Sequence, residues 1–181
     1  MLKFCIGLCL FLCVQNDNEP VISWSASYKL SWNDFKGKPR QNVSAVATTA
    51  SGITFGFSIR QSGGRVVSFT TEVHAHFYPK QSWYKVERAD NHILGHEQLH
   101  FDITELHARK FRMRISQLEV SHHIKRELNS LHRTINKELA ALQDRYDAET
   151  DYSRQVEAQL RWQLYIKKEL QKLDKYKSET K

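Results

Sequence analysis

The sequence predicts an α+β domain in which a small N-terminal antiparallel β-sheet packs on a layer of three long helices. β-Branched and aromatic residues are concentrated between residues 21 and 86. From Asp90 onward the chain has no proline and a single glycine, and its apolar residues recur every three or four positions. Strand-forming residues first and helix-forming residues second are typical of an α+β domain.

The first 18 residues have the composition of an export signal. Lys3 provides a positive charge, and the apolar run 4–14 that follows is too short to span a bilayer comfortably. The polar run 15–18 ends this segment, so a single mature domain is expected over residues 19–181. The leader predicts an exported protein that is periplasmic, secreted or held at the cell surface.

Cysteine placement supports this division of the chain. All three cysteines lie inside the leader, at Cys5, Cys9 and Cys13. Cys9 or Cys13 is a candidate site for a lipid anchor. A lipid there, or an uncleaved leader, would be the only contact with a membrane. Because residues 19–181 contain no cysteine, any metal in the domain must be held by His, Asp, Glu or Tyr.

Two long strands are predicted before the helices begin. Residues 53–59 alternate apolar and polar side chains, as a half-buried strand does. The run 61–64 is a turn signal, and residues 66–77 read as the returning strand. Pro79 ends this strand, because proline cannot donate a hydrogen bond to a β-ladder.

Helices are predicted over about 90–115, 118–146 and 153–175. The second has an apolar stripe at Ile124, Leu128, Leu131, Ile135, Leu139, Leu142 and Tyr146. The third has one at Val156, Leu160, Ile166, Leu170 and Leu173. In the first helix, Glu105 and Arg109 are four residues apart, which favours an ion pair on the helix surface.

A His-Glu-x-x-His motif occupies the first predicted helix. His96 and His100 are one turn apart on the same face, so both imidazoles can bind one metal ion. Glu97 lies beside them and is placed to act as general base toward an attacking water. His92 is one turn earlier. Because His92 and His100 are about 12 Å apart along a straight helix, His92 is expected at the rim of the site.

A catalytic zinc site usually needs a third protein ligand. No histidine lies beyond His132, whereas the segment 146–153, at the junction of two helices, is rich in acidic residues. Asp147 and Glu149 are therefore the candidates. The alternative for these acidic residues is helix capping and compensation of the helix dipole.

The chain resembles a bacterial family of exported proteins known as domain of unknown function 922. The similarity is carried by short motifs in the same order along the mature chain, namely 30–39, 82–83, 96–103, 105–109, 146–150 and 159–162. The resemblance implies a zincin-like fold and a zinc peptidase of the His-Glu-x-x-His group. It implies no particular substrate.

One position departs from the family pattern. A histidine commonly stands two residues after the threonine of Tyr-Asp-x-x-Thr, and here that position is Tyr152. We therefore rank the candidates for third ligand as Asp147, then Tyr152, then Glu149. Tyr152 is alternatively a hydrogen-bond donor to the oxyanion of a tetrahedral intermediate.

These observations predict an exported zinc-dependent hydrolase, a peptidase with Zn²⁺ as cofactor and a peptide or protein as substrate. One alternative is a catalytically inactive, zincin-like exported binding protein. A second is a basic helical module that binds nucleic acid or a membrane surface, suggested by the formal net charge of +7. Glu and Lys interleave at helical spacing in the last third of the chain, and no nucleic-acid motif is present, so no nucleic-acid partner is expected.

Overall fold

Two antiparallel sheets and three long helices make up residues 19–178, the part of the chain that the computed structural model describes. The predicted leader, residues 1–18, lies outside the described residues. The elements follow the order β1 (Ile22–Ser23), β2 (Ala47–Thr48), β3 (Ser51–Ser62), β4 (Arg65–Phe77), β5 (Trp83–Tyr84), α1 (Asn91–Ile115), α2 (Ile124–Thr150) and α3 (Val156–Lys172). Single 3₁₀ turns cover Trp32–Asp34, Val86–Arg88 and Asp174–Tyr176. The predicted α+β class is confirmed.

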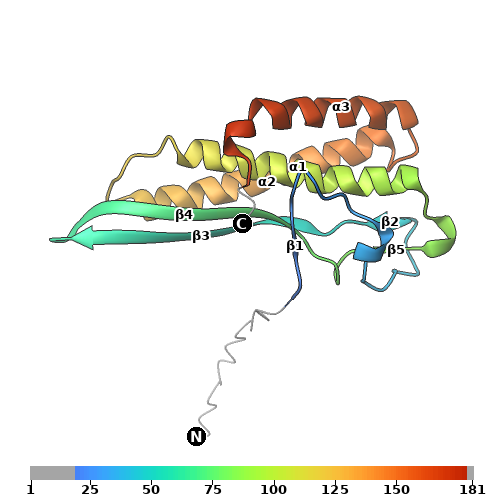
Figure 1. Cartoon of the computed structure of the whole chain (residues 1–181), viewed down its shortest axis with the longest axis horizontal. Coiled ribbons are helices and arrows are strands. Elements are labelled where there is room, and N and C mark those ends of the chain that lie inside the picture. The colour runs from blue at the N-terminus through green and yellow to red at the C-terminus, as the bar shows by residue number, and fades with distance from the viewer. Residues whose placement is uncertain (1–18, 179–181) are drawn as a thin grey trace, which may run out of the picture.

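The β3–β4 hairpin dominates the larger sheet, whose strand order is β1-β4-β3. Its turn uses Gly63 and Gly64, with φ of 57° and 77°, a conformation that glycine adopts without steric cost. The pairing of β3 and β4 shifts by one residue between Arg60 and Gln61. The smaller sheet pairs β2 with β5. Figure 1 shows the hairpin running along one side of the helical layer, with α3 on the opposite side.

Helix α1 is the central element, because it contacts the hairpin as well as α2 and α3. Large side chains fill the space between α1, α2 and the sheet, among them Phe77, Phe101, Phe111, Ile124, Leu128 and Ile135. A second cluster joins the three helices through Leu99, Ile103, Leu106, Leu139, Tyr146, Trp162 and Ile166. Both predicted strands and all three predicted helices are present, with boundaries that differ by a few residues.

The apolar face predicted for α3 is partly wrong. Val156 and Leu160 are each 54% exposed, whereas Ile166 is fully buried. Helix α3 instead packs through Trp162 and Gln159, whose positions fix which side of the helix faces α1 and α2. The apolar residues of this helix lie on more than one face, so their spacing alone selects the wrong one.

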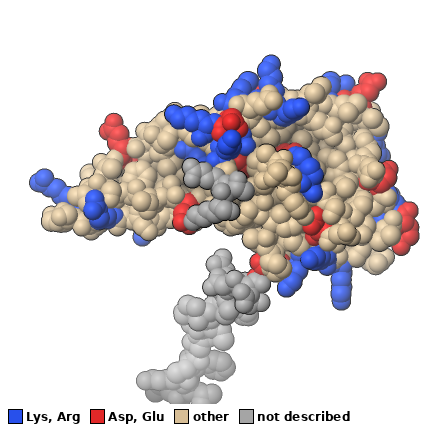
Figure 2. Space-filling model, viewed as in Figure 1, with Lys and Arg blue, Asp and Glu red and all other residues tan. Residues whose placement is uncertain are grey.

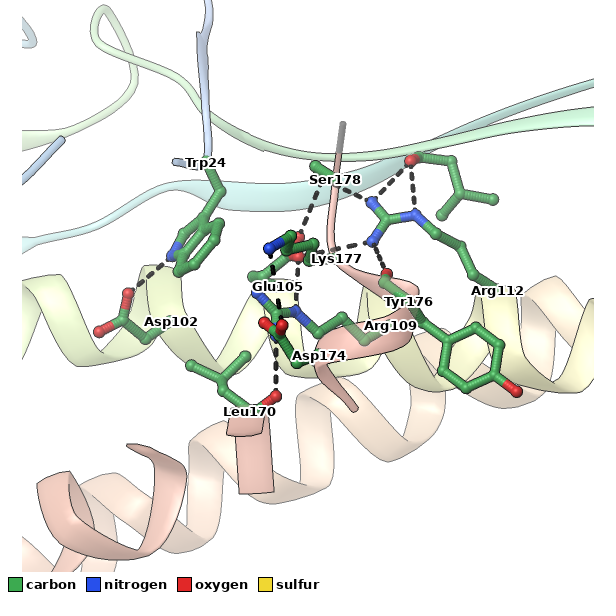
Figure 3. A network of polar contacts seen from close by, with 11 residues as sticks. Trp24, Asp102, Glu105, Arg109, Arg112, Leu170, Asp174, Tyr176, Lys177 and Ser178 are labelled. Atoms are coloured by element: carbon green, nitrogen blue, oxygen red, sulfur yellow. Dashed lines mark hydrogen bonds and ion pairs between the residues drawn. The ribbon is translucent and has the colours of Figure 1, made fainter. Parts of the chain in front are cut away.

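The ion pair predicted for Glu105 and Arg109 forms, but it is buried and not on the surface. Glu105 is fully buried, and its Oε1 accepts hydrogen bonds from Arg109 Nε at 2.9 Å and Arg112 Nη1 at 3.4 Å. Arg109 also donates to the Leu170 carbonyl, and Arg112 to the Tyr176 carbonyl. Figure 3 shows this network joining α1 to the end of the described chain.

The buried His107 predicts a loss of stability in acid. Its Nδ1–H donates to the Ile103 carbonyl at 2.9 Å, and burial lowers its pKa from 6.5 to about 4. Below pH 6.5 the unfolded chain gains a proton that the folded chain does not, so the unfolding free energy falls with pH. From pH 6.5 to 4 this histidine removes about 3 kcal/mol of stability.

Urea unfolding of the wild type and His107→Gln at both pH values tests this. The variant is expected to lose about 3 kcal/mol less than the wild type over the same interval, because glutamine does not titrate. Equal losses in the two proteins would contradict the assignment to His107.

Candidate metal centre

Helix α1 brings the motif histidines together. Asp90 caps the helix, because its side chain accepts a hydrogen bond from Ile93 N at 2.8 Å. His96 and His100 follow one turn apart, and their Nε2 atoms are 3.3 Å from each other. Both side chains lie on the side of α1 that meets the last turn of α2.

Asp147 completes the group from α2. Its Oδ1 lies 3.0 Å from His96 Nε2 and 2.9 Å from His100 Nε2. The three ligand atoms lie within 4.8 Å of one another, so the group could hold a metal ion. The residue that the sequence ranked first as third ligand is therefore the one that meets the two histidines.

The donor set suits a divalent transition metal. Two imidazole nitrogens and one carboxylate oxygen are ligands that zinc commonly takes, with one position left open in catalytic sites. Glu97 lies beside the group, 5% exposed, and its Oε2 is buried with no hydrogen-bond partner among the described residues. A carboxylate oxygen left buried in this way calls for a partner outside the protein, such as a water at the metal.

Hydrogen bonds govern the charges of this group. Burial opposes ionisation of Asp147, but the hydrogen bonds from His100 and His96 outweigh it and hold the pKa of Asp147 below its ordinary value. Burial also favours the neutral form of His100. The hydrogen bond to Asp147 and the negative charges of Glu97 and Asp147 outweigh burial, so the pKa of His100 is raised. A metal ion would take the place of the shared protons, so its binding releases protons.

Tyr146 supports the histidines from beneath. Its ring stacks on His96 with centroids 4.5 Å apart, and meets His100 edge-on at 5.1 Å. Burial raises its pKa, so the phenol stays neutral. The sequence identified Tyr146 as a member of the apolar stripe of α2 and of the family motif 146–150, and gave it no role at the site. Its position next to Asp147 was the available signal that it also orients the ligands.

The other two candidates for third ligand lie elsewhere. Glu149 points away from the histidines, accepting hydrogen bonds from Arg145 Nε at 2.7 Å and Trp162 Nε1 at 2.9 Å. Tyr152 is 66% exposed and lines the same cavity as the histidines, with no hydrogen bond to them. Tyr152 is therefore a wall residue of the cavity and not a member of the converging group.

A cavity of about 730 Å³ opens over the group. The segment 44–49, which includes β2, forms one wall, and residues 152–154 form another. Arg88 and Gln143 also line it, together with His96, Glu97, His100 and Asp147. Thr49 ties the first wall to α1 by donating to the Glu97 carbonyl at 3.1 Å.

The wall after α2 has an unusual backbone. Asp151, Tyr152 and Ser153 have φ of 48°, 53° and 71°, three consecutive non-glycine residues in the left-handed region. Each such residue costs about 1–2 kcal/mol. Strain of this kind persists only where surrounding contacts impose it, and it is concentrated at functional sites.

A model of a family described as a bacterial protein of unknown function (DUF922) matches residues 25–155. The matched range contains the three candidate ligands, His96, His100 and Asp147. It also contains Glu97 and Tyr152. No curated protein and no solved structure matches the chain.

Proposed function

The chain belongs to the DUF922 family of bacterial proteins of unknown function, and we propose that it is an exported zinc-dependent hydrolase that cleaves peptides or proteins. One observation carries the proposal: His96, His100 and Asp147 converge from two helices, next to a buried Glu97 carboxylate, at the floor of an open cavity. A site that only stabilised the fold would not need the open cavity or the unpaired carboxylate.

The roles follow from the positions of the side chains. His96, His100 and Asp147 would hold the zinc ion, which when bound polarises a carbonyl group and lowers the pKa of water. Glu97 accepts a proton from the attacking water and returns it to the leaving amine. Tyr152, on the cavity wall, donates a hydrogen bond to the oxyanion that forms from the scissile carbonyl.

The proposal that the protein is exported depends on the leader predicted from the sequence. Within residues 19–178 no helix combines the length and the apolar character that crossing a bilayer demands. Figure 2 shows Lys and Arg side chains at several places on the viewed face, with Asp and Glu side chains among them.

Chelation and reconstitution test the proposal. The metal-free protein is expected not to cleave a mixture of quenched fluorescent peptides, and about one equivalent of zinc should restore cleavage. Glu149→Gln is the matched control, since Glu149 lies outside the site, and it should respond like the wild type. Protein that binds one zinc and cleaves nothing would instead indicate the exported binding protein.

A further inference from the structure

His92 makes a short contact with the strained wall of the cavity. It lies one turn before His96 on α1, and its Nε2 is 2.6 Å from the Ser153 carbonyl oxygen. Since a carbonyl only accepts, Nε2 must carry the proton and donate. His92 therefore does more than line the rim of the site, the role that the sequence led us to expect. Its hydrogen bond joins the start of α1 to the left-handed turn 151–153.

Gln159 of α3 fixes the orientation of this imidazole. Gln159 is 1% exposed, and its Nε2 donates to the His92 carbonyl at 2.9 Å and lies 3.4 Å from His92 Nδ1. A donor facing Nδ1 makes that atom the acceptor, and this leaves the proton on Nε2, where the Ser153 carbonyl needs it. Three elements thus meet at one imidazole ring.

The other bonds of the turn are local. Tyr152 N donates to the Asp147 carbonyl at 2.9 Å, and Arg154 pairs with Asp151 on the exposed surface. Among the hydrogen bonds of Ser153 within residues 19–178, the one to His92 is the only one from another element. Figure 1 shows the α2–α3 connection at the same end of the molecule as the start of α1. The His92 bond is therefore the tie between the turn and the helix that carries the motif.

We propose that His92 is a positioning residue: its hydrogen bond to Ser153 holds the left-handed turn, and so keeps Tyr152 on the wall of the cavity facing the substrate. This inference rests on the proposed function for its effect on hydrolysis. Its effect on the turn is independent of activity. Without the bond, the strained residues relax and Tyr152 leaves its position, while the metal ligands stay in place.

Trypsin cleavage after Arg154 tests the turn directly in the zinc-loaded protein. His92→Phe is expected to speed cleavage of the 154–155 bond roughly tenfold, because local opening governs proteolysis and one hydrogen bond is lost. His92→Gln, which keeps a donor near the Nε2 position, should restore resistance. His122→Phe, at an exposed histidine, is the control. A His92→Phe protein as resistant as the wild type would overturn the proposal.

A double-mutant cycle tests the effect on hydrolysis. If His92 acts through Tyr152, His92→Phe in a Tyr152→Phe background should lower kcat no further, and all variants should keep their zinc. Losses that multiply, or a zinc content that falls with His92→Phe, would contradict this role. Wild-type protein with zinc and no hydrolysis would be a failure of the proposed function, and the trypsin experiment would still decide the role of His92 in the turn.

Discussion

Replacing Glu97 with glutamine is expected to lower peptide hydrolysis by roughly 10²–10⁴-fold while the protein keeps its zinc. Glutamine has nearly the same shape as glutamate, but it cannot take a proton from water. Glu97 is not one of the three converging ligands, so the metal group should survive the change. The measurement is kcat on a peptide substrate, with zinc content determined on the same preparation.

Glu149→Gln serves as the matched control, because it removes a carboxylate from the same region that faces Arg145 and Trp162 and not the cavity. It should change kcat by less than about twofold. A Glu97→Gln protein with full hydrolytic activity would exclude Glu97 as the base. Loss of zinc from that variant would mean that Glu97 acts as a ligand.

Glu105→Gln is expected to lower the free energy of unfolding by about 3–5 kcal/mol. Glu105 is fully buried between Arg109 and Arg112, and its Oε2 also lies 3.4 Å from Ser178 Oγ, which donates to it. Glutamine would leave two guanidinium groups near each other, with only the exposed Asp174, 3.5 Å from Arg109 Nη1, to balance their charge. Because Arg109 donates to the Leu170 carbonyl in the last turn of α3 and Arg112 to the Tyr176 carbonyl beyond it, this end of the chain should also loosen from α1 (Figure 3). Urea unfolding gives the change in free energy.

The control is Glu138→Gln. Glu138 pairs with Arg114 at 2.8 Å, but both side chains are about one-third exposed, at 37% and 32%. Solvent screening limits such a pair to about 1 kcal/mol. Equal losses in the two variants would show that burial gives Glu105 no special weight.

Local patterns were enough to predict most of the fold. Alternating side chains, the Gly63-Gly64 turn and a proline after the second strand define the hairpin over a short stretch of sequence. The apolar stripe of α2 is regular, and five of its seven residues are buried, while Leu131 and Leu142 are partly buried. The face of α3 was not predictable in this way, because apolar residues such as Leu160 and Trp162 compete and tertiary packing decides between them.

Some residues of the candidate site could likewise be predicted from local spacing, whereas others depend on tertiary packing. His96, Glu97 and His100 lie within one helical turn, so their spacing alone places them together. Asp147 was ranked first from the sequence, but only the packing of α2 against α1 shows that Asp147, and not Glu149, meets the two histidines. The hydrogen bond between His92 and Ser153 joins residues 61 positions apart, so no local sequence pattern could predict it.

Zinc content by elemental analysis is the most direct test of the metal centre, in the wild type, His96→Ala, Asp147→Ala and Glu149→Ala purified side by side. We expect about one zinc per chain in the wild type and in Glu149→Ala, and little or none in His96→Ala and Asp147→Ala. A wild type that takes up no metal when zinc is offered, or an Asp147→Ala protein that keeps as much as the wild type, would contradict the site.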